Sequence, residues 1–228
     1  MGNKKYQVIA LMGKAGAGKD AVQSATCKAH PNVFHKIVSC TTRPARDHEQ
    51  DGIAYDFISL EDFTRKVLNG DMLEATEFRG WFYGTPISAL MRDKINIGVF
   101  NPAGVEALVN DPRLDVMVIY INADDKTRLM RALSREDRPD CVEVCRRFLA
   151  DEKDFDALDE DIGFTIVENY DFGPLDLLEL ANNSYADFSY MWEYLGNPST
   201  FETAAFWGRD KQKKAESPAE EIIIDDLD

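Results

Sequence analysis

Residues 6–20 read YQVIALMGKAGAGKD. Tyr6–Met12 is a short apolar run of the kind found in buried strands, and residues 19–29 have a pattern typical of a helix. The glycine-rich segment Gly13–Gly18 between them favours a tight turn of the backbone. The stretch therefore predicts a strand, a loop and a helix in direct succession.

The loop fits the pattern G-x-x-x-x-G-K from Gly13 to Lys19. In such a loop, successive backbone N–H groups point into one concavity that holds phosphate oxygens, and the following helix N-terminus favours an anion. Lys19 is expected to reach the β- and γ-phosphates of ATP. The residues predicted to bind ATP here are Gly13, Ala15, Gly16, Ala17, Gly18, Lys19 and Asp20.

Asp20 stands where this pattern normally has a serine or threonine, whose hydroxyl binds Mg²⁺. A carboxylate is a good oxygen ligand for Mg²⁺, either directly or through water. Asp20 is therefore the predicted ligand of the Mg²⁺ that accompanies ATP. It also adds negative charge beside the triphosphate, which the metal would have to neutralise.

Strand and helix patterns alternate along most of the chain, which predicts an α/β fold with a three-layer parallel sheet. Residues 72–84 read instead as strand, turn and strand, so residues 43–85 are predicted to form an antiparallel insert. Further strands are predicted at residues 36–41, 53–59, 95–100, 116–121 and 164–167, and helices from Ser59 onward and at residues 103–109, 124–134, 142–155 and 175–181.

A second phosphate site is predicted on the insert. Arg43 and Arg46 lie three apart on a loop with a rigid proline between them, which suits a bidentate clamp for a dianionic phosphate. The hydroxyl groups of Tyr55 and Tyr83 can each donate a hydrogen bond to the same group.

These residues belong to a longer resemblance. Residues 39–46 (SCTTRPAR), 51–57 (DGIAYDF) and 73–85 (LEATEFRGWFYGT) resemble the monophosphate-binding segment of guanylate kinases. The resemblance covers residues 5 to 180 and weakens after Gly98. It implies a P-loop kinase core with an inserted monophosphate-binding subdomain and a helical lid. It also implies an enzyme that phosphorylates GMP or dGMP with ATP and Mg²⁺.

The resemblance assigns recognition of the base to Glu74, Ser39 and Thr85. The matching glutamate of that family accepts hydrogen bonds from the N1–H and the 2-amino group of guanine. Adenine offers neither donor, so such a carboxylate selects guanine. Ser39 and Thr85 fall where the family places hydroxyl groups near the guanine O6.

The pattern changes at residues 98–104 (GVFNPAG). The family typically ends this strand with two aspartates, and the matching positions hold Val99 and Asn101. Asn101 can still accept a hydrogen bond from the monophosphate through its side-chain carbonyl, whereas Val99 cannot bind metal. We therefore interpret Asp20 as the functional replacement for the carboxylate that the strand lacks.

Arginines gather between residues 129 and 147, where the resembling family has a mobile lid that closes over the transferring phosphoryl group. Arg135 and Arg147 match the family spacing best, while Arg138 and Arg146 are alternatives. The resemblance also implies that Asn169 contacts the adenine of ATP. The predicted catalytic residues are Lys19, Arg43, Arg135 and Arg147.

The formal net charge is −15, and it is still −9 without the six acidic residues of segment 215–228 (−15 + 6), which argues against a general affinity for nucleic acid. No run approaches the roughly 20 apolar residues of a membrane span, and the N-terminus lacks a signal-peptide pattern. The four cysteines form no C-x-x-C pair. A cytoplasmic location is expected.

The predicted domain covers residues 1–183, with the insert at 43–85 and the lid at 129–147. An aromatic extension follows at 184–208 and an acidic, disordered tail at 209–228, and segment 184–228 is a candidate binding surface for a protein partner. Two alternatives stay open for the function. One is a monophosphate kinase with another base or sugar preference, and the other is a non-catalytic module that keeps the fold and binds a protein.

Overall fold

The computed structural model describes residues 5–45, 49–78, 80–135, 139–156 and 165–169. The chain divides into two compact units, Met1–Phe188 and Ser189–Asp228, and the second unit lies wholly outside the described residues. The predictions for helix 175–181, for segments 184–208 and 209–228, and for Arg46 and Arg138 also fall outside them. Within the described residues, no helix is both long and apolar enough to cross a membrane.

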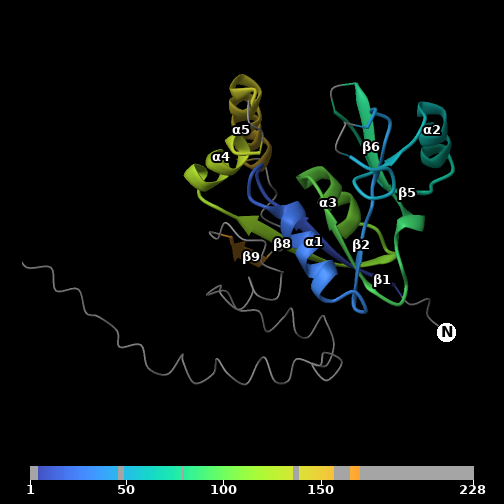
Figure 1. Cartoon of the computed structure of the whole chain (residues 1–228). Coiled ribbons are helices and arrows are strands. Elements are labelled where there is room, and N and C mark those ends of the chain that lie inside the picture. The colour runs from blue at the N-terminus through green and yellow to red at the C-terminus, as the bar shows by residue number, and fades with distance from the viewer. Residues whose placement is uncertain (1–4, 46–48, 79, 136–138, 157–164, 170–228) are drawn as a thin grey trace, which may run out of the picture. The chain divides into compact units, whose positions relative to one another are not determined.

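Five strands form the main sheet, and all of their pairings are parallel. The spatial order is β2-β7-β1-β8-β9, so the strand that precedes the P-loop lies at the centre (Figure 1). The strands are β1 (Tyr6–Met12), β2 (Phe34–Lys36), β7 (Ile95–Val99), β8 (Leu114–Asn122) and β9 (Thr165–Glu168).

Both faces of this sheet are covered. Val8 of β1 belongs to a buried cluster that includes residues of α3 (Pro102–Val109). Because side chains alternate along a strand, Ile9 points to the opposite face, where it is also fully buried. Helix α1 (Lys19–Ala29) packs on β1, β2 and β7. The predicted three-layer α/β fold is confirmed.

A second sheet of four strands, in the order β4-β3-β6-β5, lies beside the main one (Figure 1). It contains the predicted strand–turn–strand unit, and helix α2 packs on its strands β5 and β6. The side chain of Ser59 accepts a hydrogen bond from the Asp62 N–H, as expected at the start of this helix. The elements are β3 (Cys40–Thr41), β4 (Asp56–Phe57), α2 (Leu60–Leu68), β5 (Met72–Phe78), β6 (Trp81–Pro86) and the short 3₁₀ helix η1 (Ile87–Ala89).

Two predicted strands were wrong in extent. The run predicted at residues 36–41 is divided, because the chain leaves the main sheet after β2 and enters the second sheet at β3. The run predicted at residues 53–59 is a strand only at Asp56–Phe57. The preceding residues form a turn closed by a hydrogen bond from the Gly52 N–H to the Tyr55 carbonyl. The alternation of apolar and polar residues that predicted a strand here belongs to a turn, and Ile53 is exposed.

Helices α4 (Asp125–Leu133) and α5 (Cys141–Asp156) follow β8. Asp124 caps α4 through a hydrogen bond from the Thr127 N–H, and Asp140 receives one from the Glu143 N–H at the start of α5. In Figure 1, α4 and α5 stand on one side of the P-loop and the second sheet with α2 stands on the other. Among the described residues, the arginines predicted for the lid lie on the first flank, and the residues predicted to bind the monophosphate lie mainly on the second.

Candidate active site

The P-loop, residues 13–19, connects β1 to α1. Gly16 and Gly18 have φ angles of 82° and 94°, in the left-handed region that favours glycine. A Cβ at Gly16 would also lie 2.5 Å from the carbonyl oxygen of Arg128, so a side chain does not fit. Gly18 is the N-cap of α1, which places the start of that helix at the loop. The loop thus has the backbone shape that the pattern predicts.

Lys19 is folded onto its own loop. Its Nζ donates hydrogen bonds to the carbonyl oxygens of Gly13 and Lys14 at 2.6 and 3.1 Å. Burial lowers the pKa of Lys19, while the Asp20 and Asp151 carboxylates act in the opposite direction. A partly buried ammonium group held against its own loop is well placed to bind phosphate.

Three side chains from distant parts of the chain support the loop. Arg128 donates from Nε to the Ala15 carbonyl at 3.2 Å, and Arg131 donates from Nη1 to the Ala17 carbonyl at 3.3 Å. Asn169 donates from Nδ2 to the same Ala17 carbonyl at 2.7 Å and is only 4% exposed. Among the described residues, Asn169 Oδ1 is buried and accepts no hydrogen bond. Asn169 therefore holds the loop, and Oδ1 is the group it could offer to an adenine amino group.

On the other flank, the predicted phosphate ligands gather around one guanidinium. The Cζ of Arg43 lies 5.2 Å from the centre of the Tyr55 ring, and the Tyr55 and Tyr83 rings are 5.9 Å apart. Burial raises the pKa of Tyr55, with a smaller contribution from Asp20, so its hydroxyl remains a donor. The structure brings these three residues together.

Arg43 already has an anionic partner. Its Nη1 and Nη2 donate to the two carboxylate oxygens of Glu49, both at 2.6 Å, and hydrogen bonding to Glu49 raises the Arg43 pKa. Sequence reasoning missed Glu49, because nothing in its polar loop singles it out from the acids nearby. An incoming phosphate would have to share or replace this carboxylate.

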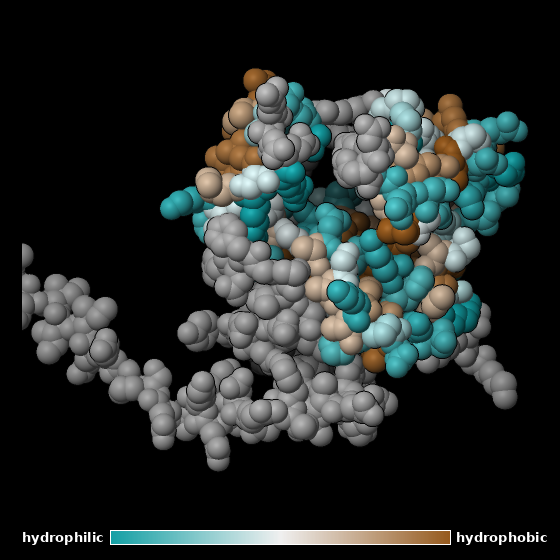
Figure 2. All heavy atoms as spheres, viewed as in Figure 1, coloured by the Kyte–Doolittle hydropathy of each residue, from teal (hydrophilic) through white to brown (hydrophobic). Residues whose placement is uncertain are grey.

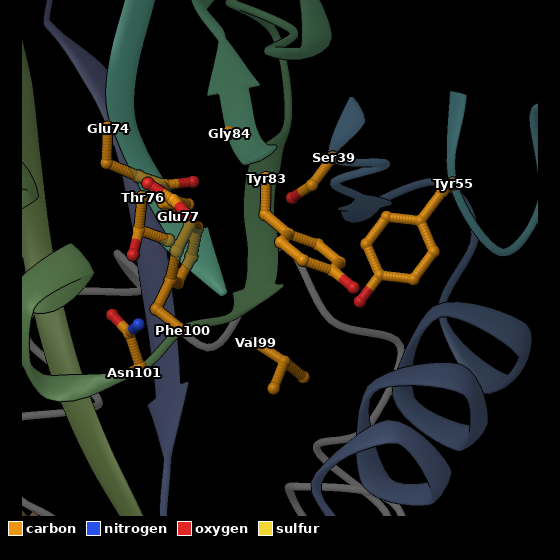
Figure 3. A pocket seen from close by; sticks show the side chains of 10 residues that line it. All are labelled: Ser39, Tyr55, Glu74, Thr76, Glu77, Tyr83, Gly84, Val99, Phe100 and Asn101. Atoms are coloured by element: carbon orange, nitrogen blue, oxygen red, sulfur yellow. The ribbon is translucent and has the colours of Figure 1, made fainter. Parts of the chain in front are cut away.

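A cavity of about 260 Å³ opens beside these residues (Figure 3). Glu74 projects from β5 toward it, and burial raises the pKa of this carboxyl group. Thr85 donates from Oγ1 to Glu74 Oε1 at 2.8 Å. Tyr55 and Tyr83 point their hydroxyl groups toward one another at the opposite side of the cavity. The lining residues are Ser39, Tyr55, Glu74, Thr76, Glu77, Tyr83, Gly84, Val99, Phe100 and Asn101.

Two residues predicted to contact the base take part in holding Glu74. Thr85 is fully buried and does not line the cavity, and its hydroxyl donates to Glu74. Ser39 lines the cavity and lies 2.8 Å from the Thr85 hydroxyl. Because Thr85 donates to Glu74, Ser39 must donate to Thr85 in this chain of hydrogen bonds. Thr85 therefore positions the carboxylate instead of reaching the guanine O6.

Asn101 also has a structural role. Its Oδ1 accepts a hydrogen bond from the Gly104 N–H at 2.7 Å, so Asn101 is the N-cap of α3. The side-chain amide nitrogen and the second lone pair of Oδ1 remain for a ligand, so the predicted hydrogen bond stays a prediction. A residue of this type caps a helix well, and the capping signal could have been read from the proline that follows it.

The donor set for a metal is sparse. Among the described residues, no group of three or more His, Cys, Asp or Glu side chains converges. Asp20 is exposed on the first turn of α1 and acts electrostatically on both Lys19 and Tyr55. Mg²⁺ commonly binds one or two carboxylates together with substrate phosphates and water. One carboxylate at this position fits that requirement.

Two arginines predicted to belong to a lid, Arg135 and Arg147, line a larger cavity of about 610 Å³ that also reaches Ala15 and Gly16. Arg135 follows the end of α4 and is close enough to lower the Lys19 pKa. Arg147 donates to Glu143 at 2.7 Å and is exposed. Figure 2 shows the surface hollowed between this flank and the second sheet. Arg135 is thus near the P-loop, whereas Arg147 is paired on the surface of α5.

A P-loop at the centre of a parallel sheet, faced by an arginine–tyrosine cluster and a half-buried carboxylate, defines a protein of the P-loop class. Residues 5–173 match the sequence model of the family described as guanylate kinase. The chain belongs to the guanylate kinase family.

Individual relatives agree with this membership. The chain is 42% identical over 89 residues to a guanylate kinase of Frankia casuarinae, covering 39% of this chain and 47% of that one. It is 40% identical over 94 residues to a guanylate kinase of Thermotoga maritima, covering 41% and 44%. The aligned parts thus span about half the length of these curated relatives. A crystal structure of guanylate kinase from Anaplasma phagocytophilum shares the fold, with a TM-score of 0.50 and 19% identity over 74% of this chain and 79% of that chain.

Proposed function

We propose that this chain transfers the γ-phosphoryl group of ATP to GMP or dGMP. The observation that carries the proposal is the half-buried Glu74 carboxylate, which faces a cavity on the second sheet and is fixed by Thr85. A carboxylate withdrawn in part from water is costly unless donors approach it, and guanine offers two adjacent donors at N1–H and the 2-amino group. The names of the relatives above support the same substrate class.

The proposed work of the protein is positioning and charge neutralisation, because phosphoryl transfer needs little covalent chemistry from the enzyme. The P-loop amides and Lys19 hold the phosphates of the donor. Arg43, Arg46, Tyr55 and Tyr83 hold the phosphate of the acceptor. In this proposal, the two sites together hold the acceptor oxygen next to the γ-phosphate.

The remaining assignments extend this proposal. Arg135 and Arg147 belong to a lid, residues 129–147, that closes over the transferring group and excludes water. Asn169 contacts adenine, Ser39 and Asn101 line the acceptor site, and residues 43–85 form the acceptor subdomain of a domain at 1–183. Mg²⁺ accompanies ATP and neutralises charge on its phosphates, and Asp20 would hold it. Segment 184–228 remains a proposed binding surface for a protein partner.

A cytoplasmic location is part of the proposal. All four cysteines are free thiols, as in a reducing compartment. Burial raises the pKa of Cys27 and Cys40 to about 11, which makes both thiols unreactive.

The base preference is tested by coupling ADP release to a panel of monophosphates with ATP and Mg²⁺. Turnover confined to GMP and dGMP supports Glu74 as the reader of the base. Turnover with AMP or a pyrimidine monophosphate would keep the phosphotransfer chemistry and refute the guanine assignment. Nucleotide binding without turnover on any monophosphate would favour the non-catalytic module instead.

A further inference from the structure

The P-loop contacts a carboxylate of the chain itself. The backbone N–H of Ala15 donates a hydrogen bond to Oδ2 of Asp151, which lies 136 residues away on α5. Ala15 belongs to the loop whose amides form the phosphate-binding concavity. The Asp151 carboxylate also acts electrostatically on the partly buried Lys19 ammonium group. A negative charge of the chain therefore lies at the Ala15 amide and acts on Lys19, the groups proposed to receive the phosphates of ATP.

The spacing of residues on α5 explains how Asp151 reaches the loop. Phe148, Asp151 and Phe155 lie three and four residues apart, so they share one face of the helix. The Arg128 guanidinium lies 4.4 Å from the centre of the Phe148 ring, and the Phe155 ring lies 5.6 Å from that of Tyr120. These contacts hold the inner half of α5 against α4 and β8, with Asp151 between them.

The outer half of α5 is exposed. Val142 is 80% exposed, and Glu143 pairs with Arg146 and Arg147 on the surface of the helix. The helix that carries Arg147 therefore also contacts the P-loop through Asp151.

We propose that Asp151 competes with ATP for the P-loop: its carboxylate occupies the Ala15 amide when no nucleotide is bound, and the donor phosphates displace it. This inference rests on the proposed function. A concavity of N–H groups beside a partly buried lysine is costly to leave without an anion, and Asp151 offsets that cost. The phosphates of ATP carry more negative charge than the Asp151 carboxylate. They accept hydrogen bonds from several P-loop amides and from Lys19 together, so ATP displaces Asp151 from the loop. Their binding then breaks the contact between Asp151 and the P-loop, while the contacts of Phe148 and Phe155 still hold α5 in place.

The test is the affinity for ATP with Mg²⁺, measured by isothermal titration calorimetry on the full chain. Asp151→Ala removes the competing group, and Asp151→Asn keeps its shape but weakens its hydrogen bond. Glu106→Gln, an exposed position on α3, is the matched control for the loss of one negative charge. We expect ATP to bind about tenfold more tightly to Asp151→Ala, in line with the loss of one charge-assisted competitor, and to Asp151→Asn by less. The control and the affinity for GMP should not change.

Unchanged or weaker ATP binding by both Asp151 variants, with the wild type and the control binding ATP normally, would overturn this inference alone. If neither the wild type nor any variant binds ATP, the proposed function fails with it. A second measurement needs no variant. The side-chain carboxyl ¹³C resonance of Asp151 in the wild-type protein should shift when ATP is added, and a resonance that stays in place at saturation would also refute the displacement.

Discussion

Replacing Glu74 by glutamine separates recognition of guanine from stability of the fold. One carboxylate oxygen of Glu74 already accepts from Thr85 at 2.8 Å, so the remaining lone pairs are those available to a base. Glutamine can keep the bond from Thr85, but its amide N–H₂ then faces the two guanine donors. Hydrogen bonds to a charged group contribute about 1.5–3 kcal/mol each, so losing the two bonds from guanine should cost roughly 3–4 kcal/mol, near the lower end of that range. We therefore expect kcat/KM for GMP to fall about 100- to 1,000-fold.

The free energy of unfolding of Glu74→Gln should not fall with kcat/KM and should, if anything, rise. Burial raises the pKa of Glu74 in the folded chain above its ordinary value. Ionising the group therefore costs stability as the pH rises from the ordinary carboxyl pKa through the raised one, and above that range the full cost is present. Glutamine removes the cost, so Glu74→Gln should be at least as stable as the wild type at neutral pH.

The assay compares GMP with IMP, which lacks the 2-amino group, by ADP release, alongside urea denaturation of each variant. In the wild type GMP should be preferred, and in Glu74→Gln this preference should largely disappear. Glu77→Gln is the matched control, because Glu77 lines the same cavity but is exposed. Its effect should stay within about fivefold, as for an exposed charge. A Glu74→Gln variant that folds normally and still prefers GMP to the wild-type extent would refute the reasoning.

Three further predictions follow from the site. The KM for GMP should rise as the pH falls through the raised pKa of Glu74, because protonation converts an acceptor into a donor, and the dependence should vanish in Glu74→Gln; a profile shared by both proteins would contradict this. Gly16→Ala should lower the free energy of unfolding by about 1–3 kcal/mol and abolish ATP binding. The alanine must adopt a left-handed φ, and its Cβ would lie 2.5 Å from the Arg128 carbonyl oxygen. Normal stability of this variant in urea would argue against the loop geometry. Asp20→Ser should raise the Mg²⁺ concentration needed for half-maximal activity, and full activity at unchanged Mg²⁺ dependence would refute the role of Asp20 as a metal ligand.

The parts of the site that could be predicted depend on local sequence. The P-loop was read from Gly13–Lys19, because left-handed glycines, a helix N-terminus and a lysine all fall within one short segment. Glu74 was identified through the spacing of a family motif. The helix capped by Ser59 was predicted from a pattern of four residues, and its cap is confirmed.

What could not be predicted arises from contacts between distant residues. Nothing in the sequence of α5 indicates that Asp151 reaches Ala15, because that contact depends on how α5 packs against α4 and β8. The burial of Thr85 behind Glu74 likewise follows from the register of β5 and β6, in which these two residues are opposite one another. Residues 36–41 were predicted as one strand, because a strand in either sheet has the same pattern of buried residues. The sequence pattern therefore does not show where the chain passes from the main sheet to the second sheet.

The central claim is that phosphoryl transfer occurs between two bound nucleotides, and product analysis tests it most directly. The purified chain is incubated with ATP, Mg²⁺ and GMP, and the nucleotides are separated and quantified over time. We expect ADP and GDP to form in equal amounts at every time point, with no excess of ADP over GDP. ADP formed without GDP, or no product despite measurable binding of both nucleotides, would contradict it.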